Sequence, residues 1–330
     1  MRRVPRRSVA LVVLLALVAL PAVVGPASAA SPNSKHDRIL AYWTKERIQS
    51  ARPRDFVRQP GGKFEPAKRP APGGPGSGNT TGSLWPDGKG TLYRVVGRVL
   101  FTMDGGNWIC SGVAATDARG DISVVVTAAH CAYDQVNKAF ATNWMFFPEF
   151  DTTPSYTCDA SVYGCWTADR LVVHSGFANQ PGFTSTATLY DWAFAVTAAG
   201  GKALGQLDAL GSFPIAFTSY GSGTAVTATG YPAGGKYSPG NELVYCSGGL
   251  AFDAWNLNRT YRLSCDMTGG SSGGPWLTSF ATSGNTGTLS SLNSYTYNGG
   301  ASMYGPKFNA YTQATWNAAV GSETGNAVVP

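Results

Sequence analysis

From about residue 92 onward, apolar positions come in short runs and not in long helical periods. β-branched residues dominate these runs, and Gly, Asn, Asp and Pro separate them at strand-like intervals. No series of strands alternates with long helices, which argues against a parallel α/β sheet. The pattern therefore predicts an all-β fold, and periodicity alone does not choose between a sandwich and a barrel. The clearest predicted strands are 92–101, 122–127, 170–173 and 224–229.

Two segments depart from this pattern. Residues 308–320 (FNAYTQATWNAAV) have helical periodicity and predict a short C-terminal helix. Residues 39–48 are compatible with a short helix near the other end of the chain.

The first 29 residues predict a signal peptide. Four arginines precede an almost wholly apolar stretch, 9–24, and Ala27-Ser28-Ala29 supplies a small-residue cleavage pattern. A membrane anchor is the weaker interpretation, because the stretch contains Pro21 and is short of the about 20 apolar residues that a span needs. We therefore predict a secreted protein without membrane association after signal removal.

Residues 30–85 differ in composition from the rest. They are rich in Pro, Gly, Lys and Arg, and they end in the low-complexity run 70–78. Such a composition is typical of a segment that does not bury enough apolar surface to order itself. A flexible linker and a segment removed during maturation are the two interpretations.

The net charge of +6 comes from these N-terminal segments. Residues 30–80 hold ten Lys/Arg and four Asp/Glu, whereas the chain from residue 81 holds eleven basic and fifteen acidic residues. Binding of nucleic acid would require a basic surface on the domain of residues 86–330. Because acidic residues outnumber basic ones in this domain, we expect no nucleic-acid partner.

All six cysteines lie in residues 86–330, and an even number in an exported chain predicts disulfides. Their clustering favours nearest-neighbour pairs among the fifteen possible pairings. A zinc site is disfavoured, since the chain has three histidines and no Cys-x-x-Cys pair. We predict no cofactor and no metal. The predicted pairs are Cys110–Cys131, Cys158–Cys165 and Cys246–Cys265.

Three local runs carry candidate chemistry. His130 in TAAHC follows a β-branched strand and adjoins Cys131, which would hold its imidazole rigidly, as a general base requires. Ser272 in GGSSGGP has glycines on both sides, which permit unusual backbone angles and close approach of a substrate. Asp191 in LYDWAFAV is a single carboxylate in an apolar run, costly to bury unless it has hydrogen-bond partners. The competing interpretations are a core histidine, a flexible Gly/Ser loop and an edge-strand aspartate that faces water.

In the order His, Asp, Ser, these runs resemble the trypsin/chymotrypsin superfamily of serine peptidases. CDMTGGSSGGP and GYPAGG are most similar to the bacterial branch that includes glutamyl endopeptidases. The resemblance implies two antiparallel β-barrels, at about 91–205 and 206–320, with the His-Asp-Ser triad between them. It also implies that Cys110–Cys131 closes the loop at the catalytic histidine. Residues 86–330 would then be a monomeric endopeptidase that acts on proteins or peptides through an acyl-enzyme.

The resemblance also implies roles for further residues. The N–H groups of Gly270 and Ser272 would form the oxyanion hole. Asp266, six residues before Ser272, stands where trypsins bind Arg or Lys, whereas Glu-specific members use a histidine near the strand that here contains Asn293 and Ser294. No histidine occurs in that run, so basic and acidic preferences both stay open. We interpret His174 as a surface or structural residue.

The residue before the nucleophile is Ser271, so the aspartate of the trypsin activation switch is absent. Residues 30–85 lie between an export signal and a predicted hydrolase, which favours a pro-segment cut between about Gly78 and Tyr93. The alternatives to a peptidase are an inactive protease-like binding protein and a serine esterase on the same fold.

Overall fold

The structure is a computed structural model, which describes residues 34–67, 81–86, 88–150, 156–297, 301–321 and 324–330. The predicted signal peptide and the low-complexity run 70–78 lie outside the described residues. No helix among the described residues is long and apolar enough to cross a membrane.

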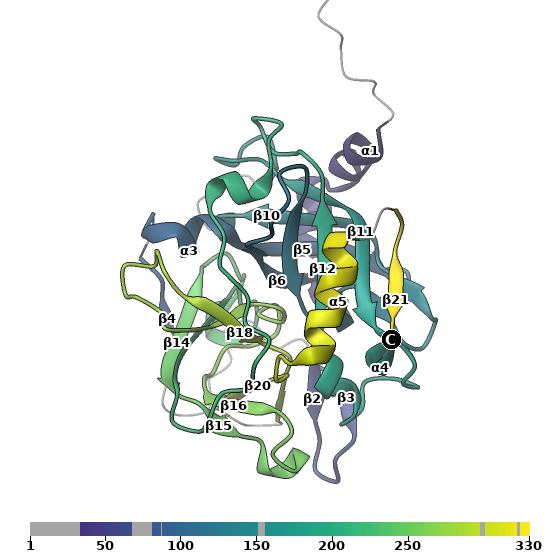
Figure 1. Cartoon of the computed structure of the whole chain (residues 1–330). Helices are drawn as coiled ribbons and strands as arrows, with labels where there is room; N and C mark the ends of the chain where they lie inside the picture. The colour runs from purple at the N-terminus through teal and green to yellow at the C-terminus, as the bar shows by residue number, and fades with distance from the viewer. Residues whose placement is uncertain (1–33, 68–80, 87, 151–155, 298–300, 322–323) are drawn as a thin grey trace, which may run out of the picture.

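A closed barrel of six antiparallel strands forms the first half of the domain (Figure 1). The strands follow the order β6-β5-β10-β11-β12-β7, and β7 pairs again with β6 to close the ring. Inward-facing Val, Phe and Leu side chains fill the barrel; Val99 and Phe146, for example, are fully buried. The barrel strands are β5 (Val96–Met103), β6 (Gly106–Ala115), β7 (Ser123–Thr127), β10 (Thr142–Pro148), β11 (Trp166–His174) and β12 (Ala193–Thr197).

The second half consists of two sheets around a separate core that includes Trp276, Leu263 and Met303. It lies below the first barrel in Figure 1. One sheet contains β4 (Ser83–Leu84), β13 (Ala225–Gly230), β14 (Val244–Gly249), β17 (Pro275–Thr278) and β18 (Thr288–Leu292). The other contains β15 (Ala251–Phe252), β16 (Tyr261–Ser264), β19 (Tyr295–Tyr297), β20 (Ser302–Gly305) and the hairpin of β2 (Phe56–Arg58) and β3 (Phe64–Pro66).

The predicted all-β, chymotrypsin-like fold with a short C-terminal helix is confirmed. The helix is α5 (Ala310–Gly321), which begins two residues later than expected. It packs on β11 and β12, where the rings of Phe194 and Trp316 meet edge to face. Further short elements of residues 86–330 are α4 (Ser175–Ala178), β8 (Tyr133–Asp134), β9 (Ala139–Phe140) and β21 (Ala327–Val329), the last of which pairs with β11.

The predicted strand 92–101 is wrong in its first half. Residues Gly90–Val95 form helix α3, and the strand begins only at Val96. A short apolar run does not distinguish a strand from a buried helical turn. Here the tertiary contacts decide, since Leu92, Tyr93 and Val95 are all buried.

Residues 34–67 are folded against the domain, so the flexible-linker interpretation is wrong for this part. They form α1 (Lys35–Tyr42), α2 (Lys45–Ser50), β1 (Arg52–Pro53), β2 (Phe56–Arg58) and β3 (Phe64–Pro66). The single helix expected at 39–48 is two helices, because Thr44 caps α2 by accepting a hydrogen bond from the N–H of Arg47.

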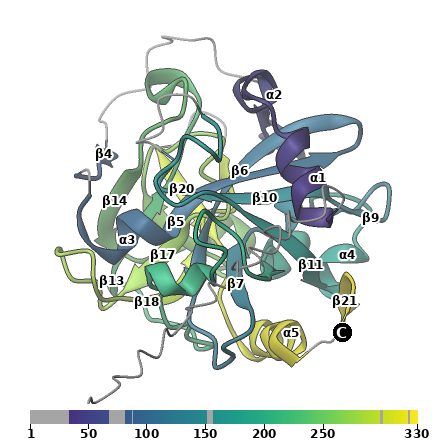
Figure 2. The same cartoon turned by 90° about the horizontal axis from the view of Figure 1, so that it is seen from above.

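The composition of residues 34–67 did not predict that they are folded, because their few apolar side chains are buried against the barrel and not against one another. Figure 2 shows α1 and α2 on the outside of the first barrel, with α1 beside β10. Ile39, Trp43 and Ile48 are buried there, and the Trp43 indole N–H donates to the carbonyl of Asn143 at 2.7 Å. A few buried apolar side chains are enough to order a segment when the barrel on which they pack is already folded.

The six cysteines form the three nearest-neighbour disulfides. Cys110–Cys131 joins β6 to the turn that holds His130, and Cys246–Cys265 joins β14 to the chain that follows β16. The first bridge anchors the turn that contains His130, and the second anchors the chain that leads to the Ser272 loop.

We expect Trp43→Ala to release residues 34–67 from the barrel, because truncating a buried tryptophan costs about 3–5 kcal/mol. Hydrogen exchange followed by mass spectrometry should show lost protection in α1 and α2 while β5 and β12 stay protected. Leu84→Ala is the control, since Leu84 is 58% exposed. Unchanged protection of α1 and α2 would contradict this account of their order.

Candidate active site

His130 lies in a 3₁₀ turn, Ala129–Cys131, that follows β7 directly. Cys131 is tied to β6, and the imidazole is 1% exposed. The residue is therefore held at a strand end, as its sequence context suggested.

Asp191 lies just before β12, at the end of a 3₁₀ turn, and is fully buried. This excludes an edge-strand aspartate facing water. One oxygen, Oδ2, lies 2.8 Å from His130 Nδ1 and accepts a hydrogen bond from Ser294 Oγ at 2.5 Å. The other, Oδ1, accepts from the backbone N–H of His130 at 3.0 Å. These partners compensate the carboxylate for the loss of water.

Ser272 lies in a tight loop that only glycines allow. Gly270 and Gly273 have φ of 97° and 82°, in the left-handed region that favours glycine. A Cβ at Gly273 would lie 2.2 Å from Thr127 Oγ1, so the loop packs directly on the strand that leads to His130. The structure thus brings the predicted His, Asp and Ser loops to one place between the two halves.

The carbonyl group of Gly270 is fixed from inside the protein. It accepts hydrogen bonds from Ser111 Oγ at 2.8 Å and from Arg98 Nη1 at 3.3 Å. Arg98 also donates to the carbonyls of Tyr231 and Gly240. Its burial lowers the pKa of its guanidinium to about 10. Sequence reasoning missed Arg98, although a cation inside the apolar run 92–101 was an available signal.

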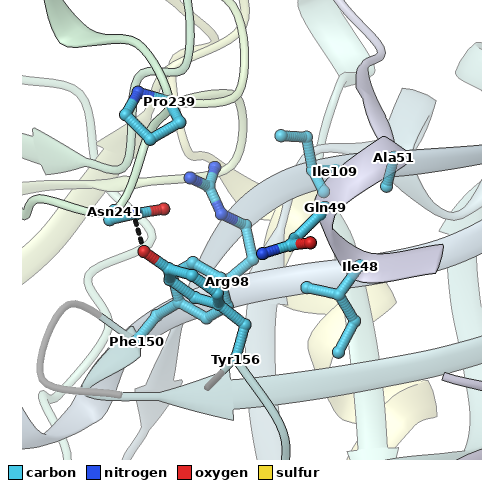
Figure 3. Close-up of a pocket in the computed structure, with 9 residues that line it drawn as sticks. All are labelled: Ile48, Gln49, Ala51, Arg98, Ile109, Phe150, Tyr156, Pro239 and Asn241. Atoms are coloured by element: carbon cyan, nitrogen blue, oxygen red, sulfur yellow. Dashed lines mark hydrogen bonds between the residues drawn. The ribbon is translucent and has the colours of Figure 1, made fainter. Parts of the chain in front are cut away.

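Arg98 also lines a cavity of about 250 Å³ (Figure 3). The figure shows its guanidinium between Pro239 and Gln49, a residue of α2. Asn241 Nδ2 donates to the hydroxyl of Tyr156 at the cavity wall. Three residues of the stretch 48–51, which belongs to the folded segment 34–67, therefore line one side of this cavity.

An unpredicted residue, Asp55, occupies the centre of the site. Ser272 Oγ donates to Asp55 Oδ1 at 2.5 Å, and the N–H of Gly270 donates to Asp55 Oδ2 at 2.9 Å. Burial raises the pKa of the Asp55 carboxyl in spite of these hydrogen bonds. No local motif pointed to Asp55, because its partners are 215 and 217 residues away in sequence.

Of the predicted triad, Ser272 and His130 are not joined by a hydrogen bond. Within the described part of the chain, His130 Nε2 is buried and has no hydrogen-bond partner. The structure therefore assembles the His–Asp pair, while Asp55 holds the serine hydroxyl.

The side chains of two of the three predicted substrate-binding residues form hydrogen bonds to other groups of the protein. Asn293 is fully buried and its amide group bonds Thr229, Ser271 and Trp276. Ser294 bonds Asp191, as described above. Neither side-chain arrangement favours direct contact with a substrate.

Asp266, the third, is only partly buried, and its charge is balanced inside the protein. It accepts from Lys236 Nζ and the Tyr237 hydroxyl, both at 2.7 Å, and from the N–H of Gly82 at 2.9 Å. Burial acts to raise the pKa of Asp266, but the hydrogen bonds from Lys236 and Tyr237 outweigh it, so the pKa is lowered. His174 is also internal, since it is buried and stacks on Tyr190.

The site offers a poor set of ligands for a metal ion. Among the described residues, Cys110, His130 and Cys131 lie close enough together to share an ion, but both sulfurs are in the disulfide and offer no thiolate.

A search of solved structures found proteins with a similar fold. The protease Anisep from Arthrobacter nicotinovorans is 34% identical, with a TM-score of 0.59, and the match covers 71% of this chain and 99% of that one. The chain belongs to the trypsin/chymotrypsin-like serine proteases. The thermostable serine protease AL20 from an extremophilic microorganism is 32% identical, with a TM-score of 0.60, over 71% of this chain and all of that one.

A Glu endopeptidase shares the fold of this serine protease at 18% identity and a TM-score of 0.57, over 75% of this chain and all of the other. Neither a scan against protein-family models nor a search of curated proteins gave a match.

We expect Ser294→Ala to destabilise the serine protease by about 1–3 kcal/mol, because it removes a hydrogen bond from the buried Asp191 carboxylate. Urea unfolding would measure the change. Ser290→Ala is a matched control, as Ser290 is also a buried serine, and its hydroxyl donates only to the carbonyl of Trp276. Equal losses for both variants would contradict a special role for Ser294.

Proposed function

We propose that this protein is a secreted serine endopeptidase that hydrolyses peptide bonds through Ser272, His130 and Asp191. The observation that carries the proposal is the buried His130–Asp191 pair, with Nδ1 and Oδ2 2.8 Å apart, beside the glycine-bounded Ser272 loop. Its membership of the serine proteases supports the same reaction class.

In this reaction Ser272 Oγ attacks the substrate carbonyl while His130 Nε2 takes the hydroxyl proton. The new Oγ–C bond forms as the carbonyl electrons move to oxygen, and the N–H groups of Gly270 and Ser272 stabilise that oxyanion. His130 then gives the proton to the leaving amine, and water hydrolyses the acyl-enzyme by the same steps. Asp191 keeps Nδ1 protonated and stabilises the imidazolium.

Arg98 and Ser111 act as positioning residues in this scheme. By holding the Gly270 carbonyl inward, they keep the loop that carries the N–H of Gly270 in one conformation. The donor is then in place before the charge develops, which is the condition for strong oxyanion stabilisation.

The two alternatives differ in what they require of Ser272. An inactive binding protein would not need a nucleophile next to an oriented histidine, and both are retained here. An esterase would use the same acyl transfer, so a digest of casein and of simple esters by the same preparation distinguishes it from a peptidase.

Ser272→Ala should lower kcat by about 10⁶, because removing the nucleophile disables the whole triad. His130→Ala should have a comparable effect. Peptide hydrolysis and labelling by a serine-directed fluorophosphonate would both report the loss. Ser271→Ala is the matched control, since its hydroxyl only donates to the carbonyl of Thr268. Full activity in Ser272→Ala would rule out the mechanism.

We further expect no preference for Lys or Arg at the cleaved bond, because Lys236 already neutralises Asp266 at 2.7 Å. Cleavage sites mapped by mass spectrometry in a peptide library, with protein freed of residues 1–78, would test this. Strong cleavage after basic residues that disappears in Asp266→Asn would show that Asp266 does bind substrate.

A further inference from the structure

We propose that residues 52–66 are an inhibitory ligand of the protein's own active site, in which the Asp55 carboxylate takes the place of a substrate's oxyanion. The inference rests on the proposed function and adds how that site is controlled. Its core is the pair of hydrogen bonds from Ser272 Oγ and from the N–H of Gly270 to the two oxygens of one carboxylate.

The Asp55 contact blocks both reacting groups. The serine hydroxyl donates to Asp55, so it does not donate to His130 Nε2, and the Gly270 donor is also occupied. A carboxylate is a poor electrophile, because its negative charge and resonance oppose attack of a nucleophile at its carbon. The group nearest the nucleophile is therefore bound but not consumed.

The peptide carbonyl of Asp55 is engaged in a hydrogen bond of its own. Its oxygen accepts a hydrogen bond from the N–H of Ala67 at 2.8 Å, next to the Phe56–Pro66 pair at the open end of the β2–β3 hairpin. Cleavage at this bond would first have to break that contact. The geometry thus protects the segment at the point where it touches the nucleophile.

Pairing on both sides of Asp55 holds the segment in the site. Before it, β1 pairs in parallel with β6, and Arg54 Nε donates to the carbonyl of His130 at 3.1 Å. After it, β2 pairs in parallel with β19 and leads away from Ser272, with Phe56 opposite Tyr295. The segment crosses the site from one half of the domain to the other.

Aromatic rings cover the general base. The Phe56 ring stacks on Phe183 with centroids 4.2 Å apart and meets the His130 ring edge-on at 5.5 Å. Phe183 also meets His130 edge-on at 5.5 Å, and Phe64 meets Phe183 and Tyr295. The segment therefore fills the space beside His130 as well as the serine loop.

The Ser272 loop accepts the segment without a side chain in the way. A Cβ at Gly269 would lie 2.7 Å from Asp55 Oδ2 and 2.9 Å from Pro53 Cβ. Close approach of the segment therefore depends on glycine at this position of the loop.

The test uses the full chain with a recognition site for an added sequence-specific protease inserted after Gly78. The fluorophosphonate labelling rate of Ser272 is measured before and after the cut. We expect slow labelling of the uncut chain and fast labelling once residues 1–78 have been separated. In the uncut chain, Asp55→Ala should speed labelling by about 10- to 100-fold, the range expected for lost hydrogen bonds to a charged group.

Glu65→Ala is the matched control. Glu65 is another carboxylate of the same hairpin, but its ion pair is with Lys63 at 3.7 Å, at an exposed position. This variant should label as slowly as the wild-type chain.

A synthetic peptide of residues 34–67 gives a second measurement, which does not depend on the folding of the Asp55→Ala chain. Added to the cut enzyme, it should slow labelling, and the same peptide with Asp55→Ala should do so at least tenfold more weakly. Two peptides of equal strength, or an uncut wild-type chain that labels as fast as the cut one, would overturn the inference. A cut enzyme that neither labels nor hydrolyses casein would instead overturn the proposed function.

Discussion

The carboxylate of Asp191 is the constraint around which the site is arranged. A buried negative charge is tolerated only when donors surround it. Two of its donors come from His130, at the end of β7, and one from Ser294, just before β19. The charge therefore joins the first barrel to the second half of the domain. The Ser272 loop lies at the same junction.

A second buried charge, Arg98, has a complementary effect on that loop. Its guanidinium lies under the loop and holds three backbone carbonyls, including that of Gly270, turned inward. The outward face of the loop then offers an N–H group that needs an acceptor. In this structure the acceptor is Asp55, and in the proposed reaction it would be the substrate. Inhibition and catalysis would thus use one and the same donor.

Much of this could be predicted from the sequence, and the misses share a cause. The β-fold, the C-terminal helix and the loops of His130 and Ser272 were predictable because each has a local signature. The order of residues 34–67 was not, since their composition does not show that a ready-made barrel surface will bury Trp43. Arg98 and Asp55 were missed because their roles arise only from contacts between distant parts of the chain. Residues 92–95 of helix α3 were misassigned because so short a run fits either secondary structure.

The covalent link between the segment of residues 34–67 and the domain changes the strength of their association. A covalent link between two binding partners gives them an effective concentration that can be on the order of millimolar. A single cut in residues 68–80 removes none of the contacts described above but makes the association bimolecular. Release of the segment then depends on dilution. A protein exported into a large volume would lose its segment, whereas one kept in a confined space would retain it.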